Sequence, residues 1–263
     1  MLPYDPSYDL FDAGIYDHVH TGVEGDVAFY VEEARKAGGP VLELGCGTGR
    51  ILIPIAEAGI DIVGLDLSRN MLAVLREKLA KQPDEVQRRV ELVEGDMRTF
   101  ALGRRFPLAM IPYRAFLHLM TIDDQMRALT TIREHLVDGG RLALNFFDPN
   151  LAYIVERQLD GGAPRKNAAF RNPATGRLTV GWDSFDYDTT RQWLDGYFTF
   201  DEYDASGAVV STRRVPLRLR WVYQYEMQHL FERAGFAIEA LYGDFQRGAF
   251  KAGGEQVWIA RRV

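Results

Sequence analysis

The chain has 263 residues, a formal net charge of −6, 47% hydrophobic residues and one cysteine. This length suits one large α/β domain, or one domain with an insertion, around a core of ordinary size. No run of about 18 apolar residues occurs, and the first 34 residues contain no Lys or Arg. We therefore expect no membrane span, no transit peptide and no basic nucleic-acid face. The single cysteine excludes an internal disulfide and fits a reducing cytoplasm.

The first 23 residues are rich in aromatic and acidic side chains, and they include Tyr16, His18 and His20. One interpretation is an arm whose aromatic residues dock on the body of the protein. The other is a cap over a functional site. His18 and His20 alternate along the chain, but no further Cys or His cluster accompanies them. We therefore expect no metal site.

Residues 41–50 predict a buried strand, a glycine loop and the start of a helix. An amphipathic helix over 24–37 precedes them and ends at Gly38-Gly39-Pro40. Glycine adopts positive φ and lets a ligand approach the bare backbone. The first amides of the helix over 50–58 point back toward the loop. We expect this arrangement to form a cradle of N–H groups for a polar or anionic ligand.

The residues around the loop distinguish between ligands. A dinucleotide fold usually has G-x-G-x-x-G, whereas here the glycines alternate from Gly45 onward and Glu43 ends the strand. A carboxylate beside the loop favours a cationic ligand over a pyrophosphate. Asp66 ends the next strand, 21 residues after Gly45, at the separation expected of a carboxylate that binds two ribose hydroxyls. Cys46 is interpreted as a small filler, because no base lies beside it in sequence.

Further strands alternate with helices that begin at Ser68 and Thr121, which predicts an α/β fold with a doubly wound parallel sheet. The expected strands cover 60–65, 90–94, 106–111 and 141–147. The helix from Thr121 is expected to end at Gly139-Gly140. Ligands bind beyond the carboxyl ends of parallel strands, so residues 112–118 should face the site. Arg114 could clamp an acceptor carboxylate or phosphate, or pair with an acid such as Glu43.

The glycine loop, Asp66 and Gly95-Asp96-Met97 together resemble the class I S-adenosylmethionine (SAM) dependent methyltransferases. In that family the loop holds the methionine end of SAM, the first acid binds the ribose, and the second acid binds the adenine amino group. The phrases Tyr16-Asp17-His18 and Phe116-Leu117-His118-Leu119 resemble the small-molecule N-methyltransferases that modify amino-deoxysugars. The resemblance covers roughly residues 8–150 and 220–263.

The resemblance implies a Rossmann-like, mostly parallel sheet of seven strands, with SAM as cofactor and S-adenosylhomocysteine as product. The cofactor-binding residues that it implies are Glu43, Gly45, Cys46, Gly47, Gly49, Asp66, Leu67, Met71, Gly95, Asp96, Met97 and Pro112. Core packing is the simpler account of Met71, which could serve both purposes. From their place after the fourth strand, Tyr113 and Arg114 are expected to bind the substrate.

The catalytic candidates are His118 and Tyr16. An amine acceptor must lose a proton before or during attack on the methyl group, and a histidine near its ordinary pKa can accept that proton. His118 lies on the expected rim of the site and matches a histidine of the amino-sugar group. The alternative is a histidine packed at the start of a helix. The resemblance also places an N-terminal tyrosine, here Tyr16, near the transferred methyl.

Residues 170–220 change character and predict an antiparallel insertion of three or four strands before a last helix over 223–234. The expected domains are a cap and SAM-binding core over 1–150, the insertion over 151–221, and a segment completing the core over 222–263. The insertion resembles a lid over the acceptor pocket, and a homodimer surface is the alternative. Its aromatic residues include Trp182, Phe185, Trp193, Tyr197 and Phe198.

We therefore expect a cytoplasmic SAM-dependent methyltransferase that acts on a small molecule, at nitrogen in preference to oxygen. Nucleic acid and membranes are not expected as partners. One rival is a SAM-binding protein of the same fold without methyl transfer, with a regulatory role. Another uses SAM for other chemistry, such as aminopropyl transfer, but no acid-rich polyamine motif follows the fourth strand.

Overall fold

The structure is a computed structural model that describes residues 13–263, so the first twelve residues of the expected cap lie outside the described residues. The described chain forms two compact units. The larger contains Gly22–Asn150 and Trp221–Val263, and the smaller contains Leu151–Arg220 with residues 13–21. The expected division placed the N-terminal segment with the core, whereas the structure groups residues 13–21 with the insertion.

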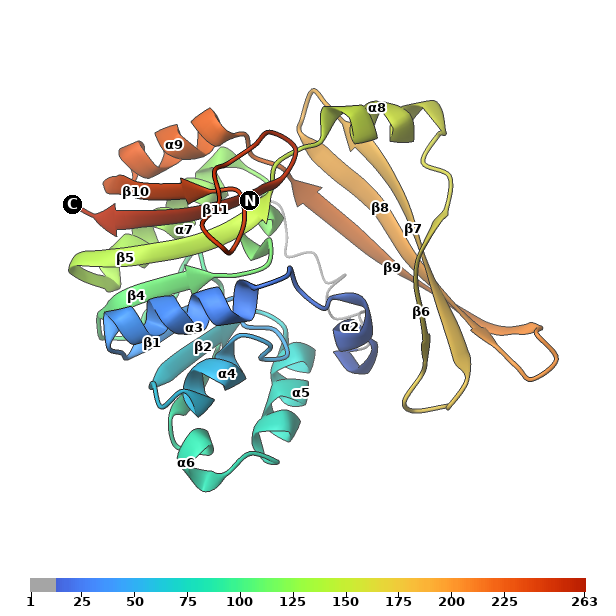
Figure 1. Cartoon of the computed structure of the whole chain (residues 1–263), viewed down its shortest axis with the longest axis horizontal. Helices are drawn as coiled ribbons and strands as arrows, with labels where there is room; N and C mark the ends of the chain where they lie inside the picture. Colours follow the sequence, from blue (N-terminus) through green and yellow to red (C-terminus); the bar gives the residue numbers. More distant parts are fainter. Residues whose placement is uncertain (1–12) are drawn as a thin grey trace. The chain divides into compact units, whose positions relative to one another are not determined.

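The larger unit is built on a seven-stranded sheet with the order β10-β11-β5-β4-β1-β2-β3 (Figure 1). Its strands are β1 (Val41–Leu44), β2 (Ile62–Asp66), β3 (Val90–Glu94), β4 (Phe106–Ile111), β5 (Leu136–Phe147), β10 (Phe236–Tyr242) and β11 (Glu255–Arg262). Strands β1 to β5 pair in parallel, and β11 runs antiparallel to both β5 and β10. The expected α/β class and mostly parallel seven-stranded sheet are confirmed.

Helices connect and cover these strands. They are α3 (Asp26–Ala37), α4 (Leu52–Glu57), α5 (Arg69–Leu79), α6 (Asp84–Gln87), the 3-10 helix η1 (Ala115–His118), α7 (Ile122–Glu134) and α9 (Gln224–Arg233). Helix α3 packs against α4 and β4, and α7 packs against α9 and β5. The side chain of Thr121 caps α7 by accepting a hydrogen bond from the Asp124 amide at 3.0 Å, and Ser68 caps α5 in the same way. No helix among the described residues has the length and apolar character needed to cross a membrane.

The end of helix α7 differs most from the prediction. Helix α7 ends at Glu134, and Leu136 already belongs to β5, where it pairs with Phe106. The register between β4 and β5 then shifts. A Cβ at Gly140 would lie 2.9 Å from the Val137 carbonyl oxygen and 3.1 Å from that of Phe106. Gly139 and Gly140 therefore lie in the crowded, irregular first part of β5, and they do not end helix α7.

Strands β1 and β4 occupy the centre of the sheet. Every residue of β1 is buried, and five of the six residues of β4 are buried as well. Strands covered on both faces are typical of an interior parallel sheet. Their carboxyl ends therefore form a rigid platform for the loops that follow them.

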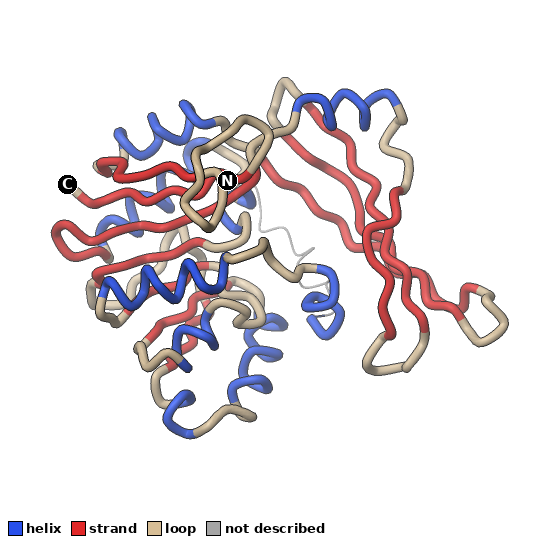
Figure 2. Tube along the Cα trace, viewed as in Figure 1, coloured by secondary structure: helices blue, strands red, loops and turns tan. Residues whose placement is uncertain are grey.

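The smaller unit contains a four-stranded antiparallel sheet with the order β6-β7-β8-β9 (Figure 2). Its elements are α2 (Ala13–Val19), α8 (Leu151–Leu159), β6 (Arg165–Arg171), β7 (Leu178–Asp188), β8 (Trp193–Tyr203) and β9 (Val209–Arg220). The expected antiparallel insertion is confirmed, with four strands. The sequence analysis did not foresee α8, which packs against β7.

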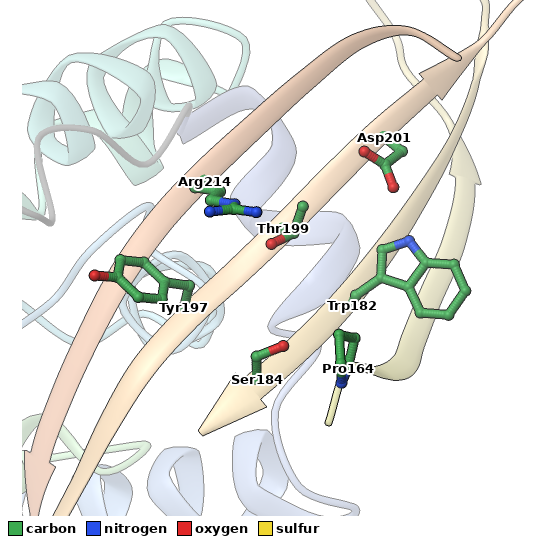
Figure 3. A pocket seen from close by; sticks show the side chains of 7 residues that line it. All are labelled: Pro164, Trp182, Ser184, Tyr197, Thr199, Asp201 and Arg214. Carbon is green, nitrogen blue, oxygen red and sulfur yellow. The ribbon is translucent and has the colours of Figure 1, made fainter. Parts of the chain in front are cut away.

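The aromatic residues of the insertion divide between the two faces of this sheet. On one face Phe185 and Phe198 are buried, with ring centroids 5.1 Å apart, and His20 contacts Phe198 edge-on at 5.5 Å. On the other face Trp182 and Tyr197 border a cavity of about 400 Å³ (Figure 3). The cavity is lined by Pro164, Trp182, Ser184, Tyr197, Thr199, Asp201 and Arg214.

Candidate cofactor and acceptor site

The glycine loop leaves β1 in a conformation that glycine favours. Gly45, Gly47 and Gly49 have φ values of 71°, 53° and 86°. A Cβ at Gly45 would lie 2.7 Å from the Cβ of Ala115, and a Cβ at Gly49 would lie 2.2 Å from Leu75 Cδ1. A Cβ at Gly47 would meet no atom of the described residues within 4 Å. The loop is therefore pinned at its two ends and has room for a ligand at its centre.

Asp66 lies beside this loop at the end of β2. One oxygen of its carboxylate accepts a hydrogen bond from the Gly47 amide at 2.7 Å, and the other accepts one from the Ser68 amide at 2.8 Å. These two bonds fix the orientation of the carboxylate at the carboxyl edge of the sheet. The neighbouring Leu67 is 41% exposed, so it can contact a flat ring, whereas Met71 is fully buried and serves the core.

Glu43 is buried beneath the glycine loop. Its Oε2 accepts no hydrogen bond from the described residues. Burial raises the pKa of this carboxyl well above its usual value, and the charge of Arg50 offsets part of that rise. An orphaned buried carboxyl needs a hydrogen-bond donor. The ammonium group at the methionine end of SAM is such a donor, so the residues present here fit this cofactor.

Cys46 is also buried in the loop, and burial raises the pKa of its thiol well above the usual value. A neutral buried thiol is a poor nucleophile, which agrees with a filler role. The described residues contain no group of three or more His, Cys, Asp or Glu side chains arranged to hold a metal ion.

Gly95, Asp96 and Met97 follow β3. The Gly95 amide donates to the Asp66 carbonyl at 2.9 Å. Burial opposes ionisation of Asp96, but hydrogen bonds from Arg98 outweigh it and lower the pKa of this carboxyl. Both carboxylate oxygens accept bonds from Arg98, which also reaches Asp124 at 3.0 Å. Asp96 thus anchors an arginine in this structure, a pairing that was not predicted from the sequence.

The turn after β4 has an unusual backbone. Tyr113 and Arg114 have φ values of 51° and 71°, which is uncommon for residues with a side chain. The Asn145 side-chain oxygen accepts a hydrogen bond from the Tyr113 amide at 2.9 Å, and the Asn145 carbonyl accepts one from the Arg114 amide at 3.0 Å. Asn145, at the end of β5, therefore holds this turn in its left-handed conformation.

Asn145 also joins two distant side chains. Its side-chain oxygen accepts a bond from the Tyr30 hydroxyl at 2.7 Å, and its amide nitrogen donates to Glu255 Oε1 at 2.7 Å. The side chain is completely buried. Sequence reasoning missed this residue. The available signal was a single polar side chain within the apolar segment 142–147.

Arg114 was expected to clamp an acceptor anion or to pair with an acid such as Glu43, and the acid that lies nearest to it is Glu255. Its Nη2 is 4.0 Å from Glu255 Oε2. The guanidinium lies over the rings of Phe147 and Tyr113, at 5.1 and 5.5 Å from their centroids. Arg50 lies over the Tyr113 ring at 5.1 Å and forms an ion pair with Asp26 at 2.7 Å.

Helix η1 continues from this turn to His118. Phe116 and Leu117 are completely buried and anchor the helix, whereas His118 is half-buried. Ala115 faces Gly45, as the short distance from a Cβ at Gly45 shows. Met97 also approaches, with Cε 3.8 Å from that Cβ position. The structure thus brings the glycine loop, Met97 and η1 to one edge of the sheet.

Tyr16 belongs to the smaller unit, on α2. Its ring centroid is 4.5 Å from that of His20, and His18 stacks on Phe170 at 5.0 Å. Pro112 is buried at the end of β4. The other expected site residues, from Glu43 to His118, all belong to the larger unit.

Comparison with known proteins identifies the family. A family profile described as "Methyltransferase domain" matches residues 41–140. A dTDP-3-amino-3,6-dideoxy-alpha-D-glucopyranose N,N-dimethyltransferase from Streptomyces fradiae is 33% identical over 178 residues, which cover 64% of this chain and 67% of that protein. The chain belongs to the SAM-dependent methyltransferases.

Two further methyltransferases are similar. The cypemycin N-terminal methyltransferase of a Streptomyces species is 33% identical over 165 residues, covering 61% of this chain. That match spans 63% of the relative, less than two thirds of its length. The structure of the CcbJ methyltransferase from Streptomyces caelestis has a TM-score of 0.80 at 25% identity and covers 99% of this methyltransferase and 100% of CcbJ. The family and its cofactor, SAM, agree with the sequence analysis.

Proposed function

We propose that this protein is a cytoplasmic methyltransferase that transfers a methyl group from SAM to an amine nitrogen of a small molecule. The observation that supports it most is the meeting of two segments at one sheet edge. The glycine loop, with the orphaned Glu43 carboxyl beneath it, touches η1 through Gly45 and Ala115. A loop suited to SAM therefore adjoins a helix that carries a histidine, His118.

The proposed cofactor contacts follow from the same edge. Glu43 and the loop residues Gly45 to Gly49, including Cys46 and Gly47, hold the methionine end. Asp66 binds the ribose hydroxyls, while Leu67 and the segment Gly95-Asp96-Met97 surround the adenine. The buried Met71 is assigned to the core. Pro112 closes the site at the end of β4. Asp96 would bind the adenine amino group while it also holds Arg98.

The residues of this chain have a limited chemical task. When bound, SAM supplies a methyl group that its sulfonium already activates. The protein must align the acceptor amine with that methyl and remove one proton from nitrogen. We assign the proton to the imidazole of His118, directly or through one water. Tyr16 is proposed to lie near the methyl, and Tyr113 and Arg114 to bind the acceptor.

The known relatives support an amine as the acceptor. Two of them act on amino groups: a dTDP-linked amino-deoxysugar in one case and the N-terminus of cypemycin in the other, as their names state. A small-molecule amine is therefore the proposed substrate class here, with no role for nucleic acid or a membrane. The insertion is proposed to act as a lid, and a homodimer formed through the insertion is the alternative.

Incubation with labelled SAM and a panel of amines and alcohols tests the function. We expect S-adenosylhomocysteine and a methylated amine to form together. Binding of SAM without turnover on any acceptor would instead support a SAM-binding protein of another role. Methylation of alcohols alone would contradict the assignment to nitrogen. Sedimentation tests the dimer, and a monomer at micromolar concentration would exclude it.

A further inference from the structure

Arg114 carries a charge that the described residues leave without a hydrogen-bond acceptor. Its Nε is buried and unpartnered, and its closest carboxylate oxygen, on Glu255, is 4.0 Å from Nη2. That separation exceeds hydrogen-bond length. Burial also raises the pKa of Glu255, which weakens this carboxyl as a counter-ion. A buried guanidinium nitrogen without an acceptor is an unusual feature in a folded protein.

Other arginines of the larger unit show the contrast. Arg50 binds both oxygens of Asp26, at 2.8 and 2.7 Å. Arg98 binds Asp96 and also reaches Asp124. Both guanidiniums are satisfied by carboxylates of the protein. Arg114 stands at the carboxyl edge of the same sheet and lacks such a partner within hydrogen-bond reach.

The guanidinium of Arg114 is nevertheless held in place. The Phe147 and Tyr113 rings lie against it, and Asn145 fixes the backbone of the turn that carries it. The guanidinium is a planar group of N–H donors, and these contacts already restrict rotation of the side chain. It can therefore form two parallel hydrogen bonds to one anionic group with little further loss of conformational entropy. Its side chain is 38% exposed, so a ligand can reach it.

We propose that Arg114 binds an anionic group, a carboxylate or a phosphate, on the acceptor molecule. The inference rests on the proposed function, because it assumes that the turn after β4 faces the acceptor. It narrows the substrate class to amines that also carry an anion. The same chemistry could be supplied by the carboxylate of the methionine end of SAM, so the experiment separates these two sources.

Matched pairs of amines provide the kinetic test. One pair is a dTDP-linked 3-amino-deoxysugar and its neutral methyl glycoside, and the other is an alanyl dipeptide and its C-terminal amide. We expect the wild-type enzyme to prefer an anionic member. Arg114→Gln should lower kcat/KM for that member by roughly 10- to 100-fold, through KM, and leave the neutral member unchanged. Arg114→Lys should restore part of the loss because it keeps the charge.

A binding measurement makes the inference testable even if no amine is methylated. The protein saturated with S-adenosylhomocysteine is titrated calorimetrically with the same anionic amines and with thymidine diphosphate. We expect binding that weakens at least about 10-fold in Arg114→Gln. The control is Arg105→Gln, which removes an exposed arginine next to the opposite end of β4 and should change nothing.

Three results would overturn the inference. The first is equal loss on charged and neutral acceptors in Arg114→Gln, which indicates a structural role. The second is weaker binding of S-adenosylhomocysteine in that variant, which assigns the guanidinium to the cofactor carboxylate. The third is a wild-type protein that shows no preference for and no binding of the anionic probes. Failure of the proposed function has a different signature: no amine is methylated, whatever residue stands at 114.

Discussion

The two halves of the candidate site are built by different means. At the ends of β1 and β2, the main contacts are backbone groups of the glycine loop, and Asp66 is fixed by two amides close to it in the fold. At the ends of β4 and β5, the left-handed turn is held by the side chain of Asn145, which also joins Tyr30 and Glu255. The cofactor half thus depends on backbone amides 2 and 19 residues from Asp66, and the acceptor half on side-chain contacts that reach up to 115 residues along the chain.

This difference makes the halves separable by mutation. Changes in the cofactor half should alter the affinity for SAM or its product. Changes in the acceptor half should alter turnover or acceptor binding and leave the product affinity unchanged. The predictions below test that separation, from the largest expected effect to the smallest.

Replacing His118 by Ala should lower turnover by roughly 10²–10⁴-fold, because the acceptor amine loses its proton acceptor. The affinity for S-adenosylhomocysteine, measured by calorimetry, should stay the same. His118→Asn is the matched control, since it keeps a hydrogen bond without accepting the proton. Full activity of His118→Ala between about pH 6.5 and 9 would reduce this histidine to a packing role.

Asp66→Ala should weaken SAM binding by about 1.5–3 kcal/mol, since ribose hydroxyls would lose a charge-assisted partner. The Gly47 and Ser68 amides would lose their acceptor as well. Calorimetry with S-adenosylhomocysteine measures the change. An unchanged dissociation constant would remove Asp66 from the cofactor site.

Asn145→Ala should destabilise the fold by about 1–3 kcal/mol, because it leaves the buried Tyr30 hydroxyl and the Tyr113 amide without their partner. It should also raise the KM for the acceptor, since Tyr113 and Arg114 lose their anchor. Tyr30→Phe removes one bond only and serves as the control. Denaturant unfolding, with steady-state kinetics on the folded variant, would show whether this residue supports the turn.

Glu43→Gln should show the smallest effect on folding and a pH dependence of definite sign. Burial raises the pKa of Glu43 in the folded state, so the folded protein binds this proton more tightly than the unfolded chain. The stability contributed by the protonated form is therefore present at low pH and declines as pH rises through the raised pKa.

The glutamine variant carries no such proton. The free energy of unfolding of the wild type should therefore fall relative to that of the variant as pH rises above the ordinary glutamate pKa of 4.5. Its affinity for SAM should fall, because the cofactor ammonium loses a carboxylate. Two results would show that the Glu43 carboxyl has another hydrogen-bond donor. One is a free energy of unfolding that changes with pH in the same way in both proteins, and the other is an unchanged affinity for SAM.

The sequence allowed prediction of the fold wherever local patterns were strong. Strands β3 and β4 have the predicted bounds, because each apolar run is followed at once by a glycine or a proline. The start of β5 was misplaced because Gly139-Gly140 resembles a helix end, while the pairing of Leu136 with Phe106 decided the outcome. Pairing between distant strands is a tertiary effect that a local pattern does not contain.

The candidate site shows the same limit. The glycine loop and Asp66 were predicted because their spacing along the chain is their signature. The joining of Asn145 to Tyr30 and Glu255, and of Asp96 to Arg98 and Asp124, depends on the folded positions of separate segments. Arg114 was expected to bind substrate or pair with an acid, but its orphaned Nε could be recognised only in the structure.

The contact between Gly45 and Ala115 limits how this enzyme can diversify. A side chain at Gly45 would collide with Ala115, because its Cβ would lie 2.7 Å from the Cβ of Ala115. Position 45 is therefore closed to larger residues by its neighbour across the sheet edge. Changes of acceptor range in an engineered library should accordingly be sought at Tyr113, Arg114 and His118, with Gly45 kept constant.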